Sequence, residues 1–231
     1  MADLVDYQLN DGIAVITMQN GKVNALSSPM FSALNAAFDR AEADNAVVIL
    51  AGQPGIFSAG YDLKELMTGK DAIVNLVRTG STFSRRLLAF PMPVIAACTG
   101  SAIANGGFIL MSCDYRVGIE GPFKIGLNET QIGMIMHHVG IEIPRARLTP
   151  STFNRAVFNA EMFSPEDATA AGFIDKVVPS DALMATVKAE AERLKGLKLE
   201  CFKATKQKAR KALLATLDEA IEQDAKDAGS Q

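Results

Sequence analysis

The sequence predicts an α/β fold, in which helices alternate with strands that mostly run parallel. Three observations predict it. Continuous apolar runs at residues 47–51 and 94–97 have the length and composition of buried parallel strands. Between these runs, apolar residues recur every three or four positions, as on the buried face of a helix. Beyond Pro179 the chain consists almost entirely of helix-forming residues. We therefore expect a core at residues 1–179 and a helical region at residues 180–231.

The first half of the chain marks the starts and ends of its elements clearly. Asn10-Asp11-Gly12 is a typical hairpin turn between two short strands. Ser28-Pro29 predicts an N-cap followed by proline at the first helical position. Phe90-Pro91 predicts the end of a helix. The elements expected here are strands at 5–9, 13–18 and 47–51, helices at 28–43, 61–67 and 72–89, and a loop at 52–60.

The second half begins with a strand that leads into a turn of small residues at 100–107 and then an apolar run. Ser164-Pro165 caps a later helix, and Gly172 ends it. The other expected elements are strands at 94–97, 115–119 and 173–178, a helix at 139–148 disturbed by Pro144, and helices between 181 and 228.

Composition limits the class of protein. The 231 residues carry a net charge of −3, and no basic block provides an electrostatic case for binding nucleic acid. No apolar run reaches the length of a membrane span, and the N-terminus lacks the apolar segment of a signal peptide. We therefore expect a cytoplasmic protein that does not bind membranes. The three cysteines lack metal-site spacing, so we expect no metal.

Two segments, at residues 52–60 and 100–107, each follow a strand, contain small residues and precede a helix. The first N–H groups of a helix have no partner inside it, and the helix dipole is positive at that end. Small residues let a ligand approach the backbone closely. We interpret the two turns as the halves of an oxyanion hole, which stabilises a developing negative charge.

Five segments in consistent order resemble signatures of the crotonase (enoyl-CoA hydratase/isomerase) superfamily. Two of them, PGIFSAGYDL and IGLNETQIG, are most similar to Δ3,Δ2-enoyl-CoA isomerases. The resemblance implies a crotonase-like spiral of ββα units and a C-terminal helical region used in assembly into a homotrimer or a dimer of trimers. It also implies an acyl-CoA thioester substrate and no separate cofactor. The five segments are residues 23–26, 56–63, 100–114, 125–133 and 163–178.

The resemblance also implies roles for individual residues. The N–H groups of Tyr61 and Asn105 would hold the thioester oxygen, and Glu129 would carry the proton. The family usually has glycine at the position of Asn105. The hydratases have a glutamate where this chain has Phe108, which cannot transfer a proton. The other residues expected at the substrate are Ala25, Ser58, Ala59, Gly60, Asp62, Leu63, Gly106 and Phe108.

One carboxylate with an oxyanion hole suits proton transfer better than hydration. Glu129 would remove a proton from C2 of a 3-enoyl-CoA and return it at C4, leaving the double bond conjugated with the carbonyl. The apolar Phe108 nearby would raise the pKa of Glu129 towards neutrality. We also expect Asp62 to cap its own helix. Lys64 could contact a CoA phosphate or be a solvated helix residue.

Other interpretations stay open at this level. From its residue type alone, Glu129 is more readily a solvated loop acid than a base, and the motif around it favours the catalytic role. His137 and His138 form the only histidine pair, which a packed or surface position explains most simply. A water-activating histidine would instead indicate an enoyl-CoA hydratase or another crotonase-type lyase or hydrolase. A third possibility is a catalytically weak acyl-CoA binder that keeps the oxyanion hole without the chemistry.

Overall fold

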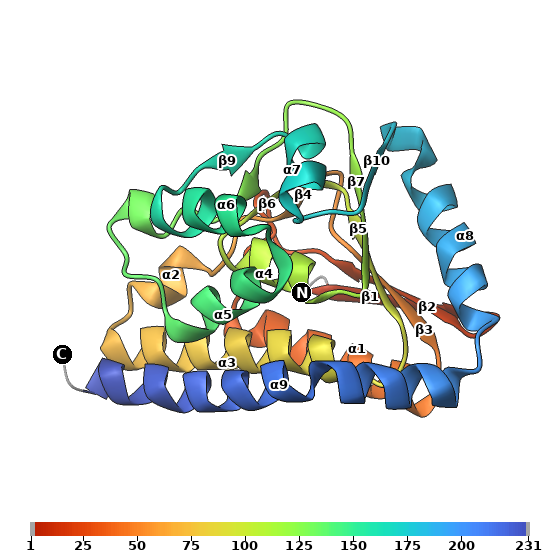
Figure 1. The fold of residues 1–231 in the computed structure, drawn as a ribbon, viewed down its shortest axis with the longest axis horizontal. Helices are drawn as coiled ribbons and strands as arrows, with labels where there is room; N and C mark the ends of the chain where they lie inside the picture. Colours follow the sequence, from red (N-terminus) through yellow and green to blue (C-terminus); the bar gives the residue numbers. More distant parts are fainter. Residues whose placement is uncertain (1–2, 230–231) are drawn as a thin grey trace.

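The computed structural model describes residues 3–229, which form two β-sheets with helices packed around them (Figure 1). The larger sheet has the order β1-β2-β3-β5-β7-β10, and all its pairs are parallel except the β1–β2 hairpin. The predicted hairpin and buried strands are thereby confirmed. The strands are β1 Val5–Asn10, β2 Ile13–Met18, β3 Val47–Ala51, β5 Val94–Cys98, β7 Tyr115–Ile119 and β10 Lys176–Val178.

A second sheet has the order β4-β6-β8-β9 and corrects two expectations. The expected loop at 52–60 contains β4, and the expected turn at 100–107 begins with β6. These strands are short and rich in small residues, so they lack the apolar alternation of a strand. Pairing with distant residues, such as Ala102 with Ile125, creates them. The strands are β4 Gly55–Ser58, β6 Gly100–Ile103, β8 Ile125–Gly126 and β9 Met162–Phe163.

Successive turns of the chain repeat one pattern, which confirms the α/β spiral of ββα units. Three successive turns, β3–β4, β5–β6 and β7–β8, each place one strand in the larger sheet and the next in the smaller sheet, and then form a helix; the first turn, β1–β2, lies wholly in the larger sheet. Each of these three units therefore brings a strand end and a helix start to the same side of the molecule. The helices are α2 Leu63–Leu66 and α3 Lys70–Ala89 after β4, α4 Asn105–Ser112 after β6, and the 3₁₀ helix η1 Thr130–Ile132 and α5 His138–Arg147 after β8.

The larger sheet is buried on both faces, which explains its continuous apolar runs. Val48 and Leu50 point into the main core, and Val47 and Ile49 point the opposite way. Helix α8, Leu183–Lys195, packs on that opposite face through fully buried Val187. Figure 1 shows α8 beside the strands and α9, Leu199–Gly229, running along α3. Four leucines of the C-terminal helical region contribute to these cores, Leu213 only partly: Leu183, Leu194, Leu213 and Leu217.

The predicted ends of α3 at Ala89 and of the later helix at Gly172 are confirmed, whereas the cap of the first helix and the start of the last strand differ from the predictions. Ser164 caps α7, Pro165–Ala171, and Gly172 ends it at φ +100°. The N-cap of α1, Ser28–Ala43, is Ser27, whose hydroxyl accepts from the Met30 N–H at 3.3 Å; the hydroxyl of the expected cap, Ser28, bonds instead to Glu65. The strand expected at 173–178 begins only at Lys176, because the N–H of Phe173 still bonds to the α7 carbonyl of Ala168. The other helices are α6 Pro150–Phe153, the π-helix η2 Asn154–Phe158 and η3 Ser180–Ala182.

No helix within residues 3–229 combines the length and apolar character needed to span a membrane.

Candidate active site

A cavity of about 1090 Å³ opens where the two predicted turns, the segment after β8 and the C-terminal end of α9 meet. Its walls are mainly apolar, and α3, α5 and α9 supply Val77, Ile141 and Ile221. Polar groups occur at separate points, among them Tyr61 and Glu129. Few polar groups in a large apolar cavity are typical of a small-molecule site.

The first turn joins β4 to α2 and leaves one backbone N–H free. The Ser58 hydroxyl accepts from the Gly60 N–H at 3.1 Å, and the Asp62 N–H donates to the Leu26 carbonyl at 3.0 Å. No acceptor for the intervening Tyr61 N–H is found among residues 3–229. Asn24 supports the turn from behind, since its Nδ2 donates to the Phe57 carbonyl at 2.8 Å.

The second turn starts α4 and brings its first N–H beside the first turn. Ala104 has φ 52° and ψ −124°, a conformation that costs a non-glycine residue on the order of 1–3 kcal/mol. A Cβ atom built on Gly60, which has φ +93°, would lie 3.3 Å from the Asn105 nitrogen and 3.0 Å from the Ala104 Cβ. The two turns are therefore in contact. That their N–H groups converge on one oxygen stays a prediction.

Helix α3 holds the Tyr61 side chain. Its Gly80 lacks a Cβ, and any Cβ there would overlap the Tyr61 phenol and lie 2.8 Å from the Asn105 Nδ2. The Tyr61 hydroxyl donates to the Val77 carbonyl at 3.3 Å. Glycine inside a helix costs roughly 0.5–1 kcal/mol relative to alanine, and here it makes room for the ring.

Glu129 lies just before η1 and lines the cavity. Glu129 is only 7% exposed, and its Oε2 has no hydrogen-bond partner within the described residues. Burial raises the pKa of this carboxyl to about 7, partly offset by a backbone hydrogen bond. A carboxyl that exchanges its proton near neutral pH and is not engaged by other groups is suited to act as a general base.

The pH dependence of stability tests this burial. The pKa of Glu129 rises from 4.5 to about 7 on folding, so the folded protein binds more protons than the unfolded chain between these values. The free energy of unfolding should therefore fall as the pH rises through this window, and this component is absent in Glu129→Gln. We expect the variant to be more stabilised relative to the parent at about pH 8 than at about pH 5. Thermal denaturation at both pH values measures the difference, and equal differences would contradict it.

The two histidines have different environments. His137 lines the cavity, and its ring meets the edge of the Phe108 ring with centroids 5.4 Å apart. Burial lowers the pKa of His137 to about 4, although the negative charge of Asp224 acts to raise it. It is therefore neutral near pH 7. His138 is largely exposed, and its Nε2 lies 2.9 Å from the Asp227 Oδ2.

Helix α9 fixes the start of α5 through Asp224, a residue that sequence reasoning did not identify. The Asp224 carboxylate accepts from the N–H of His138 at 2.7 Å and of Val139 at 3.3 Å. It caps α5 from another helix, as an N-cap side chain would do locally. Nothing in the sequence near either segment connects them, since 86 positions separate Asp224 from His138.

Removing this cap should destabilise the protein. We expect Asp224→Ala to lower the free energy of unfolding by about 1 kcal/mol, because two N–H groups lose their acceptor. Asp227→Ala is the control. It removes an exposed pair with His138, which contributes roughly 0–1 kcal/mol, and an exposed hydrogen bond from the Gln223 side chain, but no backbone cap. Urea denaturation of both variants measures the difference, and an equal or larger loss in Asp227→Ala would show that the cap contributes little.

The structure brings most of the predicted site residues to the cavity, and these are Ala25, Ala59, Gly60, Tyr61, Asp62, Leu63 and Glu129. Asp62 also caps α2, as expected, because its Oδ1 accepts from the Lys64 N–H at 2.8 Å. Residues outside the predicted set that line the cavity include Ser81, Val74, Val77, Ile141, Ile221 and Asp224.

Three residues expected at the substrate, Ser58, Gly106 and Phe108, are not among the residues that line the cavity, and their contact with a substrate stays a prediction. Ser58 uses its hydroxyl within the first turn. Gly106 packs against Ser58 so closely that a Cβ would overlap the Ser58 carbonyl. Phe108 is buried against His137. Asn105 is 1% exposed, and only its backbone nitrogen, beside Gly60, stays a candidate contact.

Comparisons with known proteins identify similar chains over nearly the whole length. The enoyl-CoA hydratase/isomerase family model matches residues 8–230. An enoyl-CoA hydratase/isomerase family protein from Pseudomonas syringae has a TM-score of 0.96 at 56% identity, covering 97% of this chain and 98% of that one. Human mitochondrial delta3-delta2-enoyl-CoA isomerase has a TM-score of 0.91 at 28% identity, covering 98% and 91%. A probable enoyl-CoA hydratase from Bacillus subtilis is 36% identical over 61% of this chain and 56% of its own length.

Proposed function

We propose that this protein, which belongs to the enoyl-CoA hydratase/isomerase family, moves the double bond of a 3-enoyl-CoA to give the 2-enoyl-CoA. Glu129 carries the proposal. It is a buried carboxyl whose pKa burial raises to about 7, it lines the cavity, and its Oε2 is unpartnered within the described residues. The likeness to human delta3-delta2-enoyl-CoA isomerase supports the same reaction.

In the proposed reaction Glu129 removes a proton from C2 of the 3-enoyl-CoA. The electron pair of that C–H bond forms a C1–C2 double bond, and the carbonyl π electrons move to the thioester oxygen. The N–H groups of Tyr61 and Asn105 hold this charge; loss of one such donor typically costs about 10²–10³ in rate. The thioester carbonyl then re-forms, and the electrons of the C1–C2 double bond move to C2–C3. The electrons of the C3–C4 double bond bind the proton from Glu129 at C4. No atoms are gained or lost overall.

The position of Phe108 favours isomerisation over hydration. A hydratase needs acid–base groups for both water and C2, and the buried Phe108 ring provides none. The runner-up function, a hydratase or another lyase or hydrolase, would depend on His137, which lines the same cavity and is neutral near pH 7. We also propose that the apolar walls at Val74, Val77 and Ile221 hold the acyl chain. Assembly into trimers and a cytoplasmic location stay predictions.

The experiment is incubation with panels of 3-enoyl-CoA and 2-enoyl-CoA, with products separated by retention time and mass. Isomerisation gives a product of the same mass and a different retention time. Hydration adds the mass of one water and would favour the histidine-dependent alternative. Thermal shift with the same compounds identifies a binder without activity. Stabilisation by acyl-CoA with no product from either panel would contradict the proposed reaction.

A further inference from the structure

The segment that carries Glu129 is weakly held on its C-terminal side. Before it, β8 and the fully buried Leu127 anchor the chain in the smaller sheet and the core. After it, residues 130–135 are exposed. Their backbone bonds are internal to the segment, such as the Met134 N–H to the Glu129 carbonyl at 2.9 Å. Packing against the rest of the protein therefore does not fix residues 130–135, which follow Glu129.

Within the part of the chain that the structure describes, one side-chain hydrogen bond connects residues 130–135 to the rest of the protein. The Thr130 hydroxyl donates to the Val157 carbonyl in the π-helix η2 at 3.2 Å. Thr130 directly follows Glu129, so any displacement of its backbone would displace the carboxyl as well.

The Val157 carbonyl is available because Val157 lies in the last turn of η2, where carbonyls have no partner inside the helix. In an α-helix this carbonyl would accept from the N–H four residues later, that of Glu161. The Glu161 N–H instead donates to the Arg155 carbonyl at 3.0 Å, and the Asn159 N–H reaches back five residues to Asn154. The Val157 carbonyl therefore accepts from Thr130 and not from an N–H of its own helix. Single π turns are frequent at functional sites.

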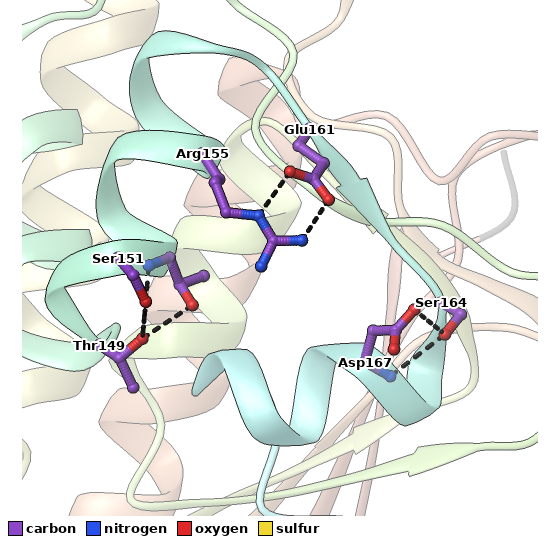
Figure 2. A network of polar contacts seen from close by, with 7 residues as sticks. Thr149, Ser151, Arg155, Glu161, Ser164 and Asp167 are labelled. Atoms are coloured by element: carbon purple, nitrogen blue, oxygen red, sulfur yellow. Dashed lines mark hydrogen bonds and ion pairs between the residues drawn. The ribbon is translucent and has the colours of Figure 1, made fainter.

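An ion pair holds the π-helix to the next strand. Figure 2 shows Arg155 and Glu161 joined by two hydrogen bonds, with the Arg155 Nε 2.7 Å from the Glu161 Oε2. Glu161 leads directly into β9, which pairs with β8 through Gly126 and Met162. The chain from β8 to Glu129 is thus connected to η2 by the Thr130 hydrogen bond, and η2 is connected back to β8 through Glu161 and β9.

We propose that Thr130 is a positioning residue, whose hydrogen bond to the π-helix carbonyl of Val157 holds Glu129 at the cavity. This rests on the proposed function, in which Glu129 is the base. Proton transfer depends on the distance between the carboxylate and C2, and a displacement of about 1 Å can cost roughly 10² in rate. The Arg155–Glu161 pair supports Thr130 indirectly by fixing η2.

The test compares Thr130→Val with Thr130→Ser. Valine keeps the branched shape without the hydroxyl, and serine keeps the hydroxyl. For Thr130→Val we expect kcat to fall about 10–10²-fold with little change in KM, and Thr130→Ser to retain most of the activity. The midpoint of the pH profile should also move down in Thr130→Val, because a looser segment exposes the Glu129 carboxyl to water.

A second measurement needs no turnover. The amide hydrogens of Ile132 and Met134 bond to the carbonyls of Asn128 and Glu129. Their hydrogen exchange should be faster in Thr130→Val than in the parent and unchanged in Thr130→Ser. Arg155→Gln should produce a smaller change in the same direction. Its matched control is Arg193→Gln, which breaks a similar two-bond pair with Glu190 on α8, far along the chain from the site.

Unchanged kcat and unchanged amide exchange in Thr130→Val would overturn the proposal. Faster exchange with unchanged kcat would also overturn it, because the bond would then order the segment without positioning the base. If the parent converts none of the enoyl-CoA substrates, the proposed function fails separately, and the exchange data still report whether Thr130 holds the segment. An equal effect of Arg193→Gln would assign the Arg155 result to general loss of stability.

Discussion

Replacing Glu129 with glutamine is expected to abolish double-bond migration while acyl-CoA binding persists. Glutamine is nearly isosteric but cannot accept a proton at neutral pH, so kcat should fall by about 10²–10⁴. KM should change little, because the base acts in the transition state rather than in substrate binding. Steady-state kinetics gives both constants, and thermal shift with acyl-CoA reports binding.

The pH profile links this loss to the Glu129 carboxyl. Proton removal needs the carboxylate, so kcat/KM of the parent should rise with pH through a midpoint near the pKa of about 7. His137, whose burial lowers its pKa to about 4, would give a midpoint well below this. Glu120→Gln, an exposed acid after β7, is the matched control and should leave activity unchanged. If Glu129→Gln keeps most of its activity, the single-base mechanism is wrong.

Gly60→Ala should have the second-largest effect, because it forces apart the two turns that form the proposed oxyanion hole. Alanine is strained at φ +93°, and its Cβ would lie 3.0 Å from the Ala104 Cβ and 3.3 Å from the Asn105 nitrogen. Separation of the Tyr61 and Asn105 N–H groups should cost at least the roughly 10²–10³ in rate expected for one donor. Kinetics of the purified variant measures the loss.

Gly55→Ala separates strain from crowding. Gly55 has φ +85°, but nothing lies within 4 Å of a Cβ built there. Backbone strain should therefore lower the stability of both variants by a similar amount. Among the folded molecules, only Gly60→Ala should lose activity. Equal activity in the two variants would show that close contact between the turns is not needed for the reaction.

Local patterns predicted the elements whose determinants lie within a few residues. Val47–Ala51 is apolar throughout because both faces of its sheet are covered, and the cap of Ser164 and the glycine of Gly172 set the ends of α7. The two turns before Tyr61 and Asn105, the helix cap of Asp62 and the choice of Glu129 also followed from short segments or from their resemblance to the crotonase superfamily. The family model and the similar structures confirm that superfamily and its fold.

The tertiary structure decided whatever depends on residues far apart in the chain. Strands β4 and β6 exist through pairing with each other and with β8, which no local periodicity records. Three residues predicted at the substrate, Ser58, Gly106 and Phe108, are outside the cavity lining, because facing elements and not residue type determine which side chains line it. Asp224 caps α5 from α9, and the Val157 carbonyl of η2 accepts from the Thr130 hydroxyl of η1, 27 positions earlier in the chain. The raised pKa of Glu129 has the same origin, since desolvation is the sum of what many distant residues cover.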